Sequence, residues 1–157
     1  MLAASIHSTI STVTPMTEIA QWNFDDWLPS DTSVGSKVIN SIVENMQRIG
    51  WPEKEIYGIH VSLEEAIINA MKHGNQRDPE KRVHVIVNST AEDFYLLVAD
   101  EGPGFDPNDV PDCTAPENLE LGSGRGLLMM RHYMDDVIYN EKGNQVELRK
   151  NRSPQQS

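Results

Sequence analysis

Three short polar stretches hold the residue types that could do chemistry, and each lies at the edge of an expected helix or strand. The first is "LEEAIINAMKHGN", residues 63–75. At about 100° per residue, Glu65, Asn69 and Lys72 fall on one stripe of a helix. A solvated face is the simpler interpretation of such a stripe, but asparagine is a poor helix former and needs another reason to stand there. An amide oxygen can bind Mg²⁺, and a carboxylate one turn earlier can take a proton from a nucleophile.

The second stretch is "ADEGPGF", residues 99–105, which follows the apolar run "FYLLV". A tight turn with solvated acids is one interpretation of it. However, Asp100 ends an apolar strand, where a partly buried carboxylate needs a hydrogen-bond donor. The amino group of adenine would be such a donor, and Gly102 and Gly104 would let a flat ring approach the backbone.

The third stretch is "LGSGRGLLMM", residues 121–130, whose glycines lead into an expected helix. Free N–H groups and the helix dipole at such a start suit a phosphate, although a flexible glycine-rich loop is a strong alternative. The stretch is not a Walker A motif, because no G-x-x-x-x-G-K-[ST] occurs. It is not G-x-G-x-x-G either, because Leu127 stands where the last glycine belongs.

Together and in this order, "EAIIN", "DEGPGF" and "GSGRGLLMM" resemble the N, G1 and G2 boxes of the GHKL (Bergerat-fold) ATP-binding proteins. The resemblance covers roughly residues 30–150. Two details resemble the stand-alone anti-sigma factor and serine-protein kinase branch. Glu65 stands four residues before Asn69, where histidine kinases usually carry a second asparagine, and the ending "GRGLLMMRHYMDDVIYNEKGNQVELRK" is similar to that of many such regulators.

The resemblance implies a role for each matching residue. Glu65 matches the general base that activates a serine hydroxyl of the partner, Asn69 matches the Mg²⁺-binding asparagine, and Asp100 matches the adenine-reading aspartate. Residues 106–121 match the lid over ATP. The nucleotide contacts implied in this way are Asn69, Lys72, His73, Asp100, Gly102, Gly104, Phe105, Gly122, Ser123, Gly124, Arg125, Gly126 and Leu127.

The implied function is that of an ATP- and Mg²⁺-dependent anti-sigma regulatory factor. It would bind a sigma factor and phosphorylate a serine or threonine of a STAS-type anti-sigma antagonist. Two alternatives stay open: a nucleotide-dependent module that sequesters its partner without transfer, and a detached histidine-kinase-like ATPase domain. The resemblance also implies a homodimer, for which "IAQWNFDDWL", residues 19–28, is the candidate contact, with core packing as the alternative.

Composition narrows the choice of partners and compartment. A net charge of −11, from 13 basic and 24 acidic residues, argues against direct contact with nucleic acid and against an anionic membrane surface. No apolar run approaches the roughly 18 residues of a membrane span, and the single cysteine, Cys113, suits a reducing cytoplasm. His60, His73, His84 and His132 show no metal-ligand spacing, so a zinc site is not expected.

Hydrophobic periodicity predicts an α+β fold, a two-layer sandwich with a mixed, mostly antiparallel sheet and about three helices on one face. We expect a flexible leader over 1–17, one ATP-binding domain over 18–150 and a disordered tail over 151–157. Within the domain, helices are predicted from Ser30 or Asp31 to Ile49, from Pro52 to His73 and from about Gly124. Strands are predicted over 19–28, 82–90, 93–100, 135–140 and 145–150, with a long loop over 101–124.

Overall fold

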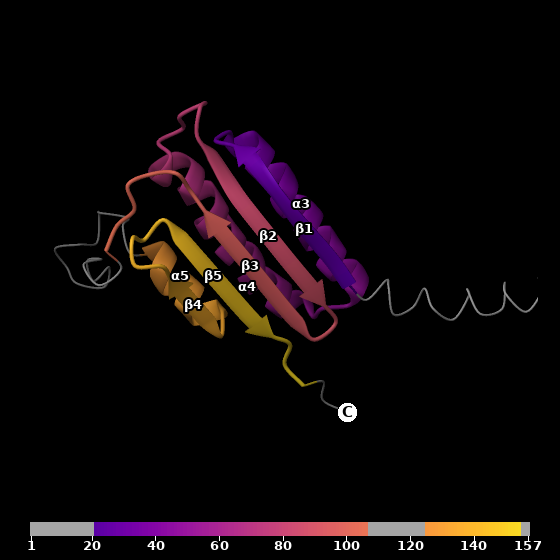
Figure 1. Ribbon diagram of the computed structural model, residues 1–157. Helices are drawn as coiled ribbons and strands as arrows, with labels where there is room; N and C mark the ends of the chain where they lie inside the picture. The colour runs from indigo at the N-terminus through magenta and orange to yellow at the C-terminus, as the bar shows by residue number, and fades with distance from the viewer. Residues whose placement is uncertain (1–20, 107–124, 155–157) are drawn as a thin grey trace, which may run out of the picture.

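The computed structural model describes residues 21–106 and 125–154, which form two layers (Figure 1). One layer is an antiparallel sheet with the strand order β1-β2-β3-β5-β4. The other consists of helices that all cover one face of that sheet. The strands are β1 (Gln21–Pro29), β2 (Arg82–Thr90), β3 (Asp93–Ala99), β4 (Asp136–Tyr139) and β5 (Gln145–Asn151), and the helices are α3 (Thr32–Ile49), α4 (Glu53–Leu63), η1 (Glu64–Ile68), η2 (Ala70–Gly74) and α5 (Arg125–Tyr133).

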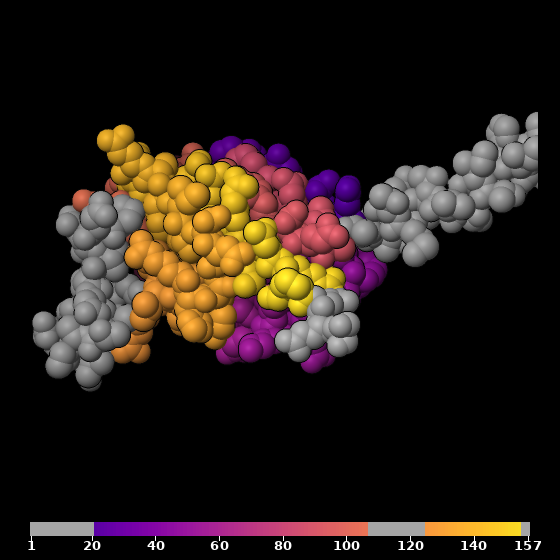
Figure 2. Space-filling model, turned by 90° about the horizontal axis from the view of Figure 1, so that it is seen from below, coloured from indigo at the N-terminus to yellow at the C-terminus, as the bar shows by residue number. Residues whose placement is uncertain are grey.

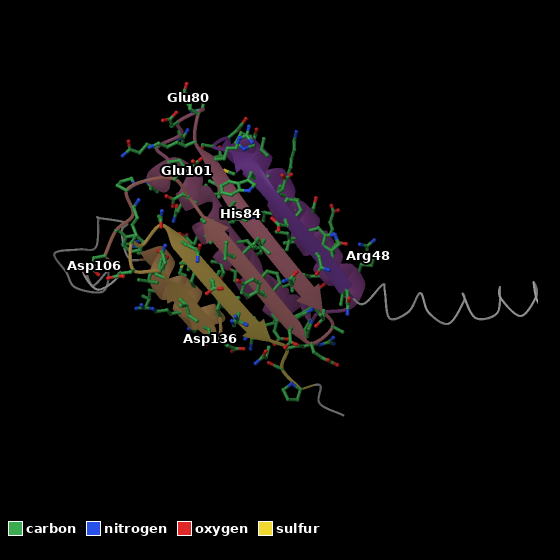
Figure 3. All side chains as sticks on the ribbon, in the orientation of Figure 1. Arg48, Glu80, His84, Glu101, Asp106 and Asp136 are labelled. Carbon is green, nitrogen blue, oxygen red and sulfur yellow. The ribbon has the colours of Figure 1, made fainter. Side chains whose placement is uncertain are left out.

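Strict alternation in the central strands explains why the helices cover one face only. In β2, Val83, Val85 and Val87 are fully buried, while the residues between them point to the other face. That other face is open and carries Trp27 of β1 and Ile138 of β4, each 49% exposed. His84, which Figure 3 labels on this open face, stacks on Trp27 with 4.3 Å between ring centroids.

Local sequence signals set the bounds of α3. The Asp31 side chain accepts a hydrogen bond of 2.9 Å from Ser33 N, which caps the first turn. Gly50 ends the helix with a φ of 104°, a left-handed conformation that costs glycine little. The helix buries Gly35, Ile39, Ile42 and Met46.

The helix that follows changes its geometry where the polar residues of the first stretch begin. Residues Glu53–Leu63 are α-helical, whereas Glu64–Ile68 and Ala70–Gly74 are π-helical. The sequence predicted one regular helix to His73, and the π turns are a correction to it. π turns are rare, and they occur often at functional sites.

The fold class is confirmed, and every described strand pair is antiparallel. The space-filling view from below shows α5 and β4 (orange) beside the helix layer (purple) and β5 (Figure 2). The leader and most of the long loop lie outside the described residues. Backbone pairing extends beyond the expected domain boundary at residue 150. Strand β5 ends at Asn151, and Arg152 N donates a hydrogen bond of 2.8 Å to Glu92 O.

The tryptophans differ in burial, and for residues 19–28 the sequence left open whether they form a contact surface or pack in the core. Trp51 is only 4% exposed and belongs to the hydrophobic core. Trp27 instead lies on the open face, because its position in β1 is paired with His84 rather than with an inward residue of β2. Among the described residues, no helix is long and apolar enough to cross a membrane.

Candidate nucleotide site

The first polar stretch places a carboxylate and an amide in direct contact. Asn69 Nδ2 donates a hydrogen bond of 2.8 Å to Glu65 Oε2, and both side chains are partly buried. The predicted stripe is thus confirmed for this pair. Because the amide nitrogen is engaged by the carboxylate, the amide oxygen is the atom of Asn69 suited to a cation.

The start of α5 lies against the same carboxylate. A Cβ built on Gly126 would come within 2.2 Å of Glu65 Oε2, so no other side chain fits there without moving Glu65. Gly126 is the second residue of α5, where backbone N–H groups have no partner within the helix. The fold therefore brings Glu65 to a helix start that the sequence predicted for phosphate. Arg125 begins α5 and is exposed, whereas Gly122, Ser123 and Gly124 lie outside the described residues.

Asp100 follows β3 at the same end of the sheet. Its Oδ1 accepts a hydrogen bond of 2.8 Å from Gly102 N. Its backbone N–H donates to Asn144 O over 2.8 Å, and its backbone oxygen accepts from Asn144 Nδ2 over 3.2 Å. Burial raises the pKa of the Asp100 carboxyl above its ordinary 3.8, and this effect outweighs the bond from Gly102 and the charges of Lys142 and Lys81, which lower it.

Glycines let the backbone close around Asp100. A Cβ on Gly74 would lie 2.4 Å from Asp100 Oδ2, and a Cβ on Gly102 would lie 1.9 Å from Gly74 O. Gly104 has a φ of 77°, and a Cβ built on it would lie 2.0 Å from Lys142 O. Gly102 and Gly104 therefore lie close to other parts of the chain, and the approach of a flat ring to them stays a prediction.

The remaining predicted nucleotide contacts among the described residues lie on η2, after β3 and on α5. Lys72 is partly buried and His73 is exposed, both on η2. Phe105 is 41% exposed and meets Tyr139 edge to face, with ring centroids 5.0 Å apart. Leu127 is 8% exposed and packs in the hydrophobic core, so its side chain serves α5 rather than a ligand.

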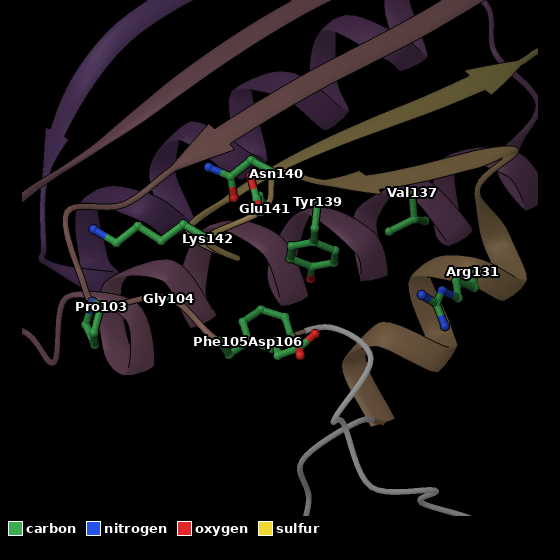
Figure 4. A pocket seen from close by; sticks show the side chains of 10 residues that line it. All are labelled: Pro103, Gly104, Phe105, Asp106, Arg131, Val137, Tyr139, Asn140, Glu141 and Lys142. Atoms are coloured by element: carbon green, nitrogen blue, oxygen red, sulfur yellow. The ribbon is translucent and has the colours of Figure 1, made fainter.

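A cavity of about 600 Å³ opens beside this site (Figure 4). Glu65, Asn69 and Asp100 do not line it. Its lining consists of Pro103, Gly104, Phe105, Asp106, Arg131, Val137, Tyr139, Asn140, Glu141 and Lys142.

Tyr139 lines the cavity, and the charges of Glu65 and Asp100 contribute to the shift of its pKa. Burial raises the pKa of its phenol to about 12; the charge of Arg131 opposes that rise, and the carboxylates of Glu65 and Asp100 add to it. Sequence reasoning missed Tyr139, because a tyrosine in a short strand carries no motif of its own.

Asn75 and Asn144 were also missed. Asn75 is fully buried directly after η2, and Asn144 holds the backbone of Asp100. Asn75 stands in the predicted break "HGNQRDP", where asparagine is a common turn residue, and Asn144 stands in the turn after Gly143. Neither turn signal says which distant group the side chain binds.

The residues present fit a nucleotide with its magnesium ion. No cluster of three or more histidine, cysteine, aspartate or glutamate side chains that could hold a metal occurs within residues 21–106 and 125–154. Mg²⁺ bound with nucleotide phosphates needs only one or two protein oxygens, which the amide of Asn69 can supply. The half-buried carboxylate of Asp100 suits the base of the nucleotide, and the start of α5 suits its phosphates.

Comparisons with known proteins agree with this geometry. Residues 28–150 match the family described as "Histidine kinase-like ATPase domain". The chain is 33% identical over 100 residues to the "Anti-sigma F factor" of Anoxybacillus flavithermus, covering 60% of this chain and 68% of the relative.

Two further relatives cover similar shares. The "Anti-sigma F factor" of Geobacillus thermodenitrificans is 34% identical over 102 residues, 61% of this chain and 69% of the relative. The "Serine-protein kinase RsbW" of Bacillus subtilis is 29% identical over 110 residues, 66% of this chain and 69% of the relative. The family model matches most of this chain, and the first polar stretch contacts both of the others. This chain therefore belongs to the histidine kinase-like ATPase domain family.

Proposed function

We propose that this protein is an ATP-binding anti-sigma regulatory factor that phosphorylates a serine or threonine of a STAS-type antagonist. The names of its relatives, anti-sigma F factor and serine-protein kinase, support the class of activity. The hydrogen bond between Asn69 and Glu65 is the observation that carries the kinase assignment. A module that only binds nucleotide needs the amide for Mg²⁺ but has no need of a carboxylate beside it.

In this proposal Asp100 accepts a hydrogen bond from the amino group of adenine, and the phosphates lie towards the start of α5. The Asn69 oxygen would hold Mg²⁺, which neutralises charge on the phosphates during transfer. Lys72 would add positive charge near them. Phosphoryl transfer depends mainly on such positioning and electrostatics rather than on covalent help from the protein.

Glu65 would act as the general base. It takes the proton from the partner's hydroxyl while that oxygen forms a bond to the γ-phosphorus and the bond to the ADP oxygen breaks. The products are ADP and a phosphoserine or phosphothreonine on the antagonist. The contact with Gly126 supports this role, because it keeps the Glu65 carboxylate at the helix start assigned to the phosphates.

We further propose a homodimer that forms through the open face of the sheet, and residence in the cytoplasm. The exposed side chains of Trp27 and Ile138 on that face support the dimer contact. Unphosphorylated antagonist would capture the kinase and release the sigma factor, whereas the phosphorylated antagonist would not.

The test is a phosphotransfer assay with purified protein, γ-labelled ATP, Mg²⁺ and the STAS proteins encoded in the same genome. Acid-stable label on a STAS protein is the expected result. Acid-labile label indicates transfer to histidine and the detached histidine-kinase-like domain. Nucleotide binding without any label, across all STAS candidates, indicates the sequestering module instead.

A further inference from the structure

Asn75 is a fully buried asparagine that joins three separate segments at the end of the sheet where Asp100 follows β3. It follows η2 directly, and its relative exposure is 0%. Its Nδ2 donates to Ser30 Oγ over 3.0 Å and to Arg82 O over 3.0 Å. Its Oδ1 accepts from Glu101 N over 2.8 Å. The amide thus has hydrogen-bond partners on both its nitrogen and its oxygen.

The bond to Glu101 acts on the residue directly after Asp100. Glu101 lies at the end of the sheet opposite Arg48 (Figure 3). Its own side chain is exposed, but its Oε1 accepts from Arg82 N over 2.6 Å. Two hydrogen bonds therefore hold the loop after β3. One joins the backbone N–H of Glu101 to the Asn75 side chain, and the other joins the Glu101 side chain to the backbone N–H of Arg82.

Close backbone contacts make this anchor stiff. The turn at Gly74 leaves no room for a Cβ beside the Asp100 carboxylate, and Gly102 leaves none beside Gly74 O. A shift of the turn would therefore move the carboxylate with it. Asn75 fixes the turn to the loop at this contact, since its backbone continues from Gly74 and its side chain bonds to Glu101.

We propose that Asn75 is a positioning residue that holds the Asp100 carboxylate where it reads the amino group of adenine. Asn75 itself touches no ligand in this proposal. The inference rests on the proposed function, in which ATP binds with its base against Asp100. It adds that selectivity for adenine depends on a buried amide on the neighbouring helix end.

A merely structural role for Asn75 makes a different prediction. Loss of its three hydrogen bonds leaves buried groups unpaired and lowers stability whether or not Asp100 is positioned by it. A loss of stability alone would weaken binding of any nucleotide equally. Inosine triphosphate (ITP) separates the two roles, because it carries a 6-oxo group, a hydrogen-bond acceptor, in place of the 6-amino group of ATP.

The experiment compares the dissociation constants of ATP and ITP, measured by calorimetry at a temperature at which every variant is folded by thermal melting. The variants are Asn75→Ala, Asp100→Asn as the reference for lost adenine reading, and Trp51→Phe as the control. Trp51 is buried, and its Nε1 donates to Thr90 O over 2.8 Å at the opposite end of β2 from Arg82. Trp51→Phe thus also removes one long-range hydrogen bond, far from Asp100.

The wild type is expected to prefer ATP over ITP by about tenfold or more, as a hydrogen bond to a charged group implies. Asn75→Ala is expected to lose most of that preference and to approach Asp100→Asn. Trp51→Phe is expected to keep it. An unchanged ATP-to-ITP ratio in Asn75→Ala would overturn the inference and leave the proposed function intact. A wild type that binds neither nucleotide would overturn the proposed function itself.

A second measurement needs no variant and covers the case in which Asn75→Ala does not fold. Amide hydrogen exchange of the wild-type protein, read residue by residue by NMR, reports the bond from Glu101 N to Asn75 directly. We expect the Glu101 amide to exchange at least about tenfold more slowly than an unbonded amide of the same sequence context. Exchange at the unprotected rate would contradict the anchor.

Discussion

The side chains of Glu65 and Asn69 form one hydrogen-bonded unit, in which Asn69 Nδ2 donates to Glu65 Oε2 over 2.8 Å. In the proposed reaction the first takes a proton and the second holds Mg²⁺. The bond fixes the orientation of the Asn69 amide, so that its oxygen rather than its nitrogen is offered to the cation. Substituting one partner therefore also affects how the other is held, and the variants must be chosen with that in mind.

Glu65→Gln is expected to keep ATP binding and to reduce phosphotransfer by about 100-fold or more, the usual contribution of a general base. A glutamine oxygen can still accept from Asn69, so the nucleotide-binding geometry is preserved. Calorimetry and transfer of label from γ-labelled ATP measure the two effects. Glu64→Gln is the matched control, since Glu64 is the exposed neighbour on the same helix, 3.6 Å from His60. Normal transfer by Glu65→Gln would remove Glu65 from the role of base.

Asn69→Ala is expected to weaken Mg·ATP binding by about tenfold or more and to abolish transfer. The reason is that it removes the protein oxygen proposed for the cation. Titrations with and without Mg²⁺ measure the effect: the wild type should bind ATP more tightly with the ion, and the variant should not. Asn88→Ala, at an exposed position of β2 away from the helix layer, is the control. An Asn69→Ala protein that still responds to Mg²⁺ like the wild type contradicts the assignment.

The raised pKa of Asp100 gives a signed pH dependence. The folded protein holds this proton to a higher pH than the unfolded chain, whose carboxyl titrates near 3.8. The contribution of Asp100 to stability is therefore fully present below the unfolded pKa and is lost as the pH rises through the folded pKa. Asp100→Asn is expected to remove this fall in the free energy of unfolding. Denaturant titrations of both proteins from pH 3 to 7 measure it.

ATP binding should depend on pH in the opposite direction. Only the ionised carboxylate accepts from the adenine amino group without competition from its own proton, so the advantage of the wild type over Asp100→Asn should shrink as the pH falls through the raised pKa. Comparing the two proteins at each pH cancels the titration of the ATP phosphates. A constant advantage across this range would show that Asp100 does not read adenine through its ionised form.

Gly126→Ala is expected to reduce phosphotransfer by about 10- to 100-fold with a smaller change in ATP affinity. The added methyl group would lie 2.2 Å from Glu65 Oε2 and must displace the carboxylate, and small displacements of a reacting group are costly. Stability should not fall for helical reasons, because alanine is the better helix former. Steady-state kinetics on the antagonist separate kcat from KM. Leu128→Ala, at an exposed position of α5, is the control and should retain the wild-type rate.

Trp27→Arg is expected to weaken the proposed homodimer by about 30-fold or more, as the loss of an aromatic anchor at an interface does. Trp27 lies on the open face of the sheet. Tyr57→Arg is the control: Tyr57 is 60% exposed, but it belongs to α4 on the opposite layer. Sedimentation equilibrium at several concentrations gives the dimer constants. Dissociation by Tyr57→Arg instead would place the contact on the helix layer.

Much of the fold was predictable because its signals are local. Alternating valines in β2, the cap at Asp31 and the stop at Gly50 each act within a few residues, and the structure follows them. The pairing of Glu65 with Asn69 was predictable for the same reason, since one helical turn separates them. The π turns around them were not, because nothing in the local pattern distinguishes a π turn from an α turn.

The sequence by itself determined which residues stand at the ends of helices and strands and which of them could bind a nucleotide. Only the tertiary structure decided that Gly126 closes on Glu65, that Asn75 reaches Glu101, and that Trp27 faces outwards. Each of these relationships joins segments far apart in the chain. They depend on strand register and on how the helices pack over the sheet, and a pattern of hydrophobic and polar residues specifies burial without specifying the partner.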